Sequence, residues 1–235
     1  MKIDILTLFP DMFKGFLNES IIRRAINTEK VKINIHNIRD YSKDPHKKVD
    51  DYGFGGGVGM VLMPQPIFDA VNHLKTNESK VLLMTPQGVT YNQTLAYKFS
   101  SEFKHIIIIC GHYEGFDERI RSIVDFEISI GDYVLTGGEI PSMVITDSIV
   151  RLLEGVINTE SHKNDSFNNN LLDYPVYTKP LEINGLKVPD ILLSGHHENI
   201  KKWRLEQQVI RTKERRPDLL AEKRWCNGLQ TLLYN

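Results

Sequence analysis

Three loops that contain glycine or proline could contact a ligand through their backbone. Each loop follows a short apolar stretch: KVLLM precedes residues 85–88 (TPQG), HIIIIC precedes residues 111–115 (GHYEG), and DFEISI precedes residues 131–139 (GDYVLTGGE). In an open parallel sheet, ligands bind beyond the carboxyl ends of the strands. Because glycine lets the backbone approach a ligand closely, the amide and carbonyl groups of such loops can read an adenine edge. The three loops together predict one ligand pocket.

The chemistry of these loops disfavours a ligand rich in phosphate. The sequence contains no Gly-Lys-Ser or Gly-Lys-Thr, which a P-loop requires, and no Gly-x-Gly-x-x-Gly opens a helix after the first predicted strand. An enzyme that acts on nucleotide phosphates is therefore disfavoured. A further stretch, GFGGGVG at residues 53–59, is not followed by lysine, which disfavours a phosphate cradle and leaves a hinge or another kind of glycine-rich loop as alternatives.

The elements that must position these loops alternate along the first two thirds of the chain. Apolar periodicity predicts strands over residues 2–9, 31–38, 80–85, 105–110 and 125–130, and helices over 19–27, 66–75, 91–102, from 117, and over 140–153. Short apolar strands between helices are typical of a parallel sheet that is covered on both faces. The predicted fold class is therefore α/β.

A polar stretch, SHKNDSFNNN at residues 161–170, interrupts this pattern and has the composition of a linker. We therefore expect an α/β domain over residues 1–160, a linker over 161–170, and a mostly helical domain over 171–235. In that last part, a long helix should follow Gly195 and continue to about Val209, and Pro217 should open another. The last part is also basic, with Arg211, Arg215 and Arg216 close together. Such a segment indicates a polyanionic partner, and the alternative is a solvated helix face.

The composition indicates a globular protein and disfavours membrane, secreted and disulfide-rich or zinc-bound classes. The 235 residues are 41% hydrophobic and 25% charged, as in soluble globular proteins. No stretch approaches the ~18 uncharged apolar residues of a membrane span, and the start of the chain lacks the pattern of a secretion signal, so we expect a cytoplasmic protein. The two cysteines, Cys110 and Cys226, are far apart in the sequence, which disfavours a disulfide scaffold or a structural zinc site.

Five motifs give the chain a resemblance to a known family. They are LFPDMF (residues 8–13), VDDYGFGGGVGM (49–60), CGHYEGFDER (110–119), SIGDYVLTGGE (129–139) and DSFNNNLLDYPVYTKP (165–180). In this order they resemble the bacterial tRNA (guanine-N(1))-methyltransferases over nearly the whole chain. The chain departs from the usual pattern at His112, often Arg in the family, at Val58, usually Pro, and at Asn164, usually Glu.

The resemblance implies a fold, a reaction and partners. The fold would be a SPOUT-type parallel sheet with a deep trefoil knot, plus a small, mostly helical C-terminal domain. The protein would be a homodimer whose active sites lie between subunits. With S-adenosylmethionine as methyl donor, it would methylate ring nitrogen one of the guanine immediately 3′ of the anticodon, in the tRNA anticodon stem-loop, and so help to maintain the reading frame. The alternative is a non-catalytic RNA-binding protein that retains the SPOUT fold.

The resemblance also assigns roles to residues of this chain. Its cofactor-binding positions fall on Leu83, Thr85, Pro86, Gln87, Gly111, Tyr113, Glu114, Ile130, Gly131, Asp132, Tyr133, Val134, Leu135, Gly137 and Gly138. Its catalytic positions fall on Asp165, Arg151 and Glu114, and RNA contacts are assigned to Asp50, Gly59, Arg211, Arg215 and Arg216. Members of the family use Mg²⁺, but no spacing in this sequence identifies metal ligands.

The reaction explains why these residue types are needed. Guanine N1 carries a proton at neutral pH, and a carboxylate that removes it, the role implied for Asp165, contributes typically ~10²–10⁴-fold. A cation such as Arg151 would stabilise the charge that develops on the exocyclic oxygen, and Glu114 would face the sulfonium of the donor. Because Asp165 lies in the predicted linker, RNA binding that orders the linker would complete the site only when substrate is present.

Overall fold

The computed structural model describes residues 1–158, 165–167 and 169–221, so parts of the predicted linker and the end of the predicted C-terminal domain lie outside the described residues. The chain divides into two compact units, Met1–Asn158 and Thr159–Asn235. Within the described ranges, no helix is both long and apolar enough to cross a membrane.

A five-stranded parallel sheet forms the centre of the first unit, which confirms the α/β class. Its strands are β1 (Lys2–Thr7), β2 (Lys32–Asn37), β5 (Ser79–Thr90), β6 (His105–Cys110) and β7 (Phe126–Ser129). Their order in the sheet is β2-β1-β6-β5-β7, and every neighbouring pair is parallel. The carboxyl ends of β5, β6 and β7 therefore lie along one edge of the sheet.

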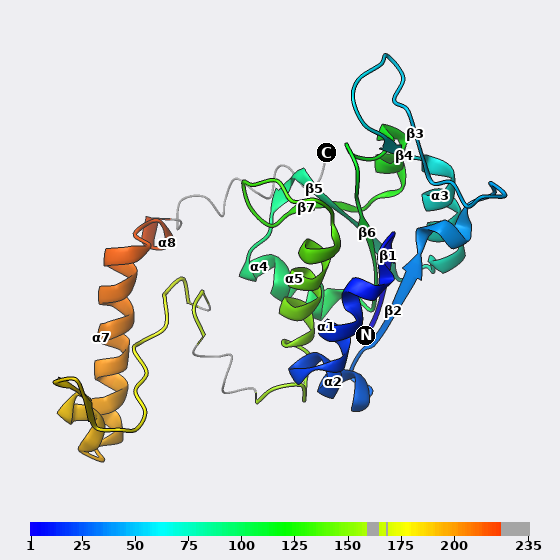
Figure 1. Ribbon diagram of the computed structural model, residues 1–235. Coiled ribbons are helices and arrows are strands. Elements are labelled where there is room, and N and C mark those ends of the chain that lie inside the picture. The colour runs from blue at the N-terminus through cyan, green and yellow to red at the C-terminus, as the bar shows by residue number, and fades with distance from the viewer. Residues whose placement is uncertain (159–164, 168, 222–235) are drawn as a thin grey trace. The chain divides into compact units, whose positions relative to one another are not determined.

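Helices cover both faces of this sheet, as Figure 1 shows. One face packs against α1 (Lys14–Asn18), α2 (Ser20–Asn27), α4 (Gln93–Glu102), α5 (Glu139–Val150) and the 3₁₀ turn η1 (Pro10–Phe13). The other face packs against α3 (Pro64–Leu74) and the 3₁₀ turns η2 (Ile38–Tyr41) and η3 (Glu118–Ile123). A small antiparallel pair, β3 (Asp50–Asp51) and β4 (Val61–Leu62), carries the GFGGGVG stretch between its strands.

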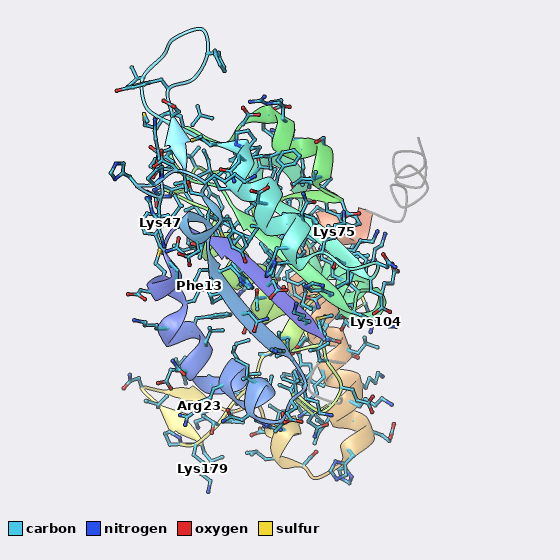
Figure 2. All side chains as sticks on the ribbon, turned by 90° about the vertical axis from the view of Figure 1, so that its right-hand side faces the viewer. Phe13, Arg23, Lys47, Lys75, Lys104 and Lys179 are labelled. Carbon is cyan, nitrogen blue, oxygen red and sulfur yellow. The ribbon has the colours of Figure 1, made fainter. Side chains whose placement is uncertain are left out.

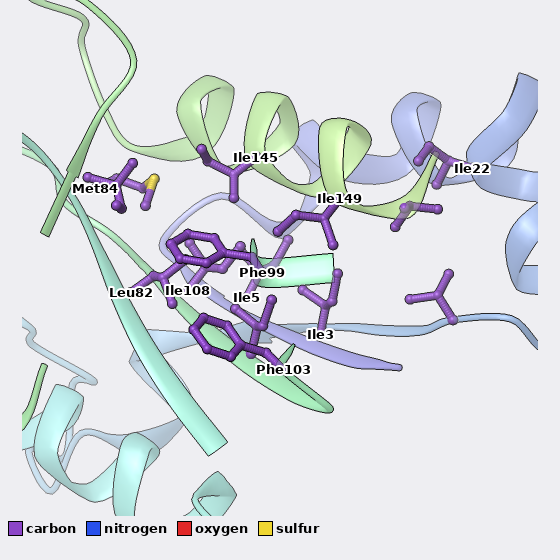
Figure 3. Packing of buried hydrophobic residues seen from close by; sticks show 14 of the residues in the cluster. Ile3, Ile5, Ile22, Leu82, Met84, Phe99, Phe103, Ile108, Ile145 and Ile149 are labelled. Atoms are coloured by element: carbon purple, nitrogen blue, oxygen red, sulfur yellow. The ribbon is translucent and has the colours of Figure 1, made fainter. Parts of the chain in front are cut away.

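The core consists of two apolar layers, because successive side chains of a strand point to opposite faces. In β6, Ile106 and Ile108 belong to the layer under α2, α4 and α5, which Figure 3 shows, whereas Ile107 and Ile109 belong to the layer under α3. Phe13 is fully buried, while Lys75 and Lys104 lie at the surface (Figure 2). The sequence of β6 is apolar at nearly every position because both faces of this strand are buried.

One carboxylate is buried within the sheet. The side chain of Asp4 has no exposed surface, and it accepts hydrogen bonds from Asn34 at 2.7 Å, from His36 at 2.9 Å and from His105 at 2.7 Å. It also pairs with the Lys2 ammonium at 2.7 Å. Burial alone would raise the pKa of Asp4, but these four polar neighbours together hold the pKa of Asp4 well below its usual range.

Two predicted helices of the first unit differ from the observed elements. The segment after Asp117 is a six-residue 3₁₀ turn rather than an α-helix, since β7 begins only a few residues later. Helix α5 ends at Val150 rather than at residue 153, because its last turn tightens into bonds from Leu152 to Ile149 and from Leu153 to Val150. The apolar spacing of residues 151–153 could not distinguish these turns from further helix.

The second unit is built around one long helix. Its described elements are the hairpin β8 (Glu182–Ile183) with β9 (Leu186–Lys187), the 3₁₀ turn η4 (Asp190–Leu193), α7 (His197–Arg215) and α8 (Asp218–Ala221). Helix α7 continues six residues beyond its predicted end at Val209. No glycine or proline occurs between that residue and Pro217, so the sequence offers nothing to stop the helix earlier.

Candidate active site

A cavity opens at the carboxyl ends of β5, β6 and β7, and all three glycine-rich loops contribute to its lining. Of the fifteen cofactor-binding residues that the resemblance implies, those that line the cavity are Thr85, Pro86, Gly111, Tyr113, Glu114, Ile130, Gly131, Tyr133, Val134, Leu135, Gly137 and Gly138. The loops are up to about fifty residues apart in the sequence, and the order of the strands brings them to one place.

Three of the implied residues do not line this cavity. Leu83 is fully buried in the layer under α3, because the alternation along β5 turns its neighbour Met84 toward the cavity instead. Gln87 is exposed, and its side-chain oxygen accepts a hydrogen bond from Arg121 at 2.5 Å. Asp132 is exposed near the start of its loop. Because the side chain of Leu83 is buried in the other layer, a contact of Leu83 with a cofactor would have to come from its backbone.

Eight further residues line the cavity although sequence reasoning did not select them, namely Met84, His112, Gly115, Phe116, Ile128, Ser129, Thr136 and Pro141. His112, Gly115 and Thr136 lie inside the quoted loops, so their position beside selected residues was the available signal. Met84 and Ile128 instead belong to strands, where only the register decides which side chain reaches the cavity.

The first loop reaches the cavity because it leaves the sheet. Met84 and Val89 of β5 both pair with Ile128 of β7, so the four residues between them bulge out of the ladder. Thr85 and Pro86 lie in this bulge and line the cavity. The hydroxyl of Thr85 accepts a hydrogen bond from the backbone amide of Gln87 at 3.2 Å, which stabilises the turn.

The second and third loops touch through their backbones. The amide of Gly138 donates to the carbonyl of Gly111 at 2.8 Å. A Cβ on Gly138 would stand 2.7 Å from Cα of Cys110, closer than real Cβ atoms approach backbone. Glycine is therefore required here because the backbone at Cys110 leaves no room for a Cβ. The backbone conformation is not the reason, since the φ of −82° at Gly138 is open to any residue.

A buried carboxylate anchors the start of α5 beside the cavity. Glu139 is 2% exposed, and it accepts a hydrogen bond from the hydroxyl of Thr7, at the end of β1, at 2.7 Å. Nearby, Nδ1 of His112 is buried and has no hydrogen-bond partner among the described residues. Both side chains approach Gly137, where a Cβ would lie 2.3 Å from Glu139 and 2.8 Å from His112.

The GFGGGVG stretch is held against the second loop. Backbone bonds join Leu62 to Gly115 at 3.0 Å and Glu114 to Met60 at 3.1 Å, just after the stretch ends. Gly59 has a φ of +89°, and a Cβ on it would collide with the side chain of Glu114 at 2.3 Å. The end of this loop therefore lies beside a residue that lines the cavity.

The cavity lining carries a negative charge. Within the described residues, the lining contains one carboxylate, that of Glu114, and neither lysine nor arginine. Such a lining suits a cationic ligand and lacks the basic groups that bind phosphate. No group of three or more His, Cys, Asp or Glu side chains that could hold a metal ion occurs in the described part of the chain.

The three implied catalytic residues fall in both units: Arg151 and Glu114 in the first, and Asp165 in the second. Arg151 is half-buried at the C-terminal end of α5, and its amide donates to the carbonyl of Asp147 at 3.0 Å. Asp165 is half-buried in the second unit. Glu114 is exposed in the second loop, between Tyr113 and Gly115, both of which also line the cavity.

The implied RNA contacts lie on two elements. Asp50 begins β3, at one end of the hairpin that carries Gly59. Arg211 and Arg215 lie on α7, half-buried and exposed respectively. Arg216 follows directly, and its guanidinium pairs with Asp218 at 2.6 Å.

A cavity at the carboxyl ends of parallel strands, built from glycine-rich loops and acidic in its lining, defines the cofactor-binding domain of an α/β enzyme whose ligand carries little phosphate. The family model described as tRNA (Guanine-1)-methyltransferase TrmD matches residues 1–222. This chain belongs to that family.

Full-length relatives support the assignment. A tRNA (guanine-N(1)-)-methyltransferase of Mycoplasma mycoides subsp. mycoides is 58% identical over 220 residues, which cover 94% of this chain and 92% of the relative. That of Ureaplasma urealyticum is 58% identical over 219 residues, covering 93% and 96%. That of Halalkalibacterium halodurans is 55% identical over 238 residues, covering 99% and 96%.

Proposed function

We propose that this protein transfers the methyl group of S-adenosylmethionine to N1 of the guanine immediately 3′ of the tRNA anticodon, and thereby helps to maintain the reading frame. Its family identifies a tRNA (guanine-N(1))-methyltransferase, and the alternative of a non-catalytic RNA-binding protein is not favoured. The observation that carries the choice of cofactor is the cavity lining. Its single carboxylate and its backbone-rich loops match a sulfonium cation joined to an adenosine.

The bound donor supplies an electrophilic methyl group. In the proposed reaction, the carboxylate of Asp165 takes the proton of guanine N1, whose electron pair then forms the bond to the methyl carbon while the carbon–sulfur bond breaks. Arg151 stabilises the negative charge that develops on the exocyclic oxygen. The products are N1-methylguanine and S-adenosylhomocysteine, and Asp165 later returns its proton to solvent.

We also infer that the first unit contains the deep trefoil knot of SPOUT enzymes. The argument rests on the path of the chain after β7, an edge strand beside β5. From there the chain returns across the sheet, since α5 packs on the central strands β1 and β6. It makes this return in backbone contact with Gly111, through the amide of Gly138. Knotted chain paths of this kind are rare in proteins.

The proposed assembly is a homodimer with active sites between subunits. An apolar patch supports it: Phe9 and Met12 of η1, and Ile140 and Val144 of α5, are between 39% and 50% exposed. Phe9, Met12 and Ile140 surround a small hollow that also touches His112, a residue of the cofactor cavity. An Ile140→Glu variant tests the assembly, because a buried charge at the patch should give monomers in sedimentation velocity runs.

The proposed tRNA-binding part is residues 171–235, joined to the catalytic part (1–160) through residues 161–170. Its long helix α7 supplies Arg211 and Arg215 for phosphate contacts, and the hairpin residues Asp50 and Gly59 approach the bases. Because tRNA is the substrate, we place the protein in the cytoplasm. A target base in the anticodon loop is extruded into the pocket rather than read within a helix.

One experiment tests the function. The purified protein is incubated with methyl-labelled S-adenosylmethionine and a tRNA whose anticodon is followed by guanine, and with the same tRNA carrying adenine there. Label should enter the first tRNA only, and the Asp165→Ala and Arg151→Ala variants should lose most of the transfer. Equal labelling of both tRNAs, or full activity of Asp165→Ala, would refute the mechanism. Repeating the assay with EDTA decides whether Mg²⁺ is required.

A further inference from the structure

The segment that carries Asp165 is folded into a turn. The amide of Phe167 donates to the carbonyl of Leu171 at 2.8 Å, and the hydroxyl of Ser166 accepts from the amide of Asp173 at 2.9 Å. Phe167 has a φ of +74°, which is uncommon for a bulky residue and persists only where neighbouring contacts enforce it. Residues 165–167 and 169–174, called the base turn below, are therefore more than a spacer.

The base turn is attached to α7 through a buried hydroxyl. Thr212 has no exposed surface, and its Oγ1 accepts a hydrogen bond from the amide of Leu172 at 2.8 Å. The same hydroxyl donates to the carbonyl of Gln208, one turn earlier in α7, at 2.6 Å. Its proton is thus directed along the helix, which leaves the oxygen lone pair to hold the base turn.

Arg204 of α7 and Arg216, which caps the C-terminal end of α7, contact the base turn on either side of this bond. The guanidinium of Arg204 lies 4.7 Å from the ring centroid of Tyr174, and that of Arg216 lies 5.8 Å from that of Phe167. Thr212 lies eight residues after Arg204 in α7, and the amide of Arg216 donates to the carbonyl of Thr212 at 2.9 Å where the helix ends. The contacts of Phe167, Leu172 and Tyr174 fall successively earlier along α7, so the base turn runs antiparallel to the helix.

We propose that Thr212 and Arg216 are positioning residues for the proposed general base, and that the base turn and α7 move as one body. Asp165 is then brought into action by the helix that binds tRNA, and docking of tRNA delivers the base to the guanine. The inference rests on the proposed role of Asp165. It also changes the role assigned to Arg216, whose guanidinium is engaged by Phe167 and Asp218 rather than directed mainly to phosphate.

The first test compares Thr212→Val with Thr212→Ser. Valine keeps the shape but removes the acceptor for the amide of Leu172, whereas serine keeps the oxygen. Thr212→Val should lower the single-turnover rate of methyl transfer about tenfold or more, since small misplacements of a reacting group have effects of this order. The Kd for tRNA should stay within about twofold, hydrogen exchange at Leu172 should accelerate, and Thr212→Ser should restore the rate.

The second test compares Arg216→Ala with Arg215→Ala, neighbouring exposed arginines of the same segment. Arg216→Ala should lower the single-turnover rate at saturating tRNA and leave the slope of log Kd against log salt unchanged. Arg215→Ala should instead weaken tRNA binding and reduce that slope by about 1. Because Arg216 is exposed, its removal does not threaten the folding of the unit, so this pair decides the matter even if Thr212→Val fails to fold.

The outcomes separate this inference from the proposed function. If wild-type protein transfers no label to tRNA, the proposed function fails. If wild type is active, Asp165→Ala is inactive, and both Thr212→Val and Arg216→Ala keep the wild-type single-turnover rate, then only the positioning inference is overturned. A reduced salt slope for Arg216→Ala with an unchanged rate would restore its role as a phosphate contact.

Discussion

Replacement of Gly138 by alanine should disrupt the cofactor cavity through a single methyl group. The new Cβ would stand 2.7 Å from Cα of Cys110 and 2.9 Å from the amide nitrogen of Gly111. Both neighbours are backbone atoms, one of them at the end of a buried central strand, so neither can rotate away. The start of α5 must shift until these distances reach the 3.4 Å of ordinary van der Waals contact.

The size of the effect follows from that displacement. Overpacking in a well-packed interior costs about 1–3 kcal/mol, and the backbone conformation of Gly138 adds no strain of its own. The shift moves Gly137 and Gly138 relative to Gly111, and all three line the cavity. If the loops regain their binding geometry only at that cost, the Kd for S-adenosylmethionine rises by about 5–150-fold.

Isothermal titration calorimetry with S-adenosylmethionine measures this effect, and thermal unfolding of the same samples measures the loss of stability. Gly15→Ala is the matched control, because Gly15 lies in the short helix α1 with nothing within 4 Å of an added Cβ. It should bind the cofactor as wild type does and should be at least as stable. A Gly138→Ala protein with wild-type affinity and wild-type melting temperature would show that the reasoning from close approach is wrong.

Three further predictions concern charge and burial. Glu114→Gln should weaken binding of S-adenosylmethionine more than that of S-adenosylhomocysteine, because only the former is a cation facing this carboxylate; equal losses in calorimetry would contradict this. Asp4→Asn should lose about 3–5 kcal/mol of unfolding free energy at pH 7. Since the folded pKa of Asp4 is depressed, its contribution is full above the unfolded pKa, so the difference from wild type in urea melts should shrink as pH falls below about 4. Burial, with the nearby Glu139 carboxylate, raises the pKa of the Cys110 thiol, so in a Cys226→Ser protein iodoacetamide at pH 8 should label Cys110 only after denaturation.

Much of the fold could be predicted because its signals are local. Strand β6 is a continuous apolar run, and its burial on both faces follows directly from that composition. The glycines that follow each of these strands likewise indicated the loops that line the cavity. The 3₁₀ turn at η3 could not be predicted, since the same residues could form a helix if the next strand began later.

The site itself was predictable only in part. The motifs indicated which loops form it, but the choice between Leu83 and Met84 depends on how β5 pairs with its neighbours, a property of the sheet. The same holds for Glu139, whose partner Thr7 is 132 residues away in the sequence. A single sequence contains no signal for such a contact.

By itself, the sequence determined the class of fold, the exclusion of a P-loop, and the resemblance that led to the family, because periodicity and motif order are written along the chain. Only the tertiary structure decided that GFGGGVG ends against Glu114, that Gly138 is required by close approach, and that the segment around Asp165 is held by Thr212 of α7. These facts depend on which distant backbones meet, and that is fixed when strand order and packing bring the segments together.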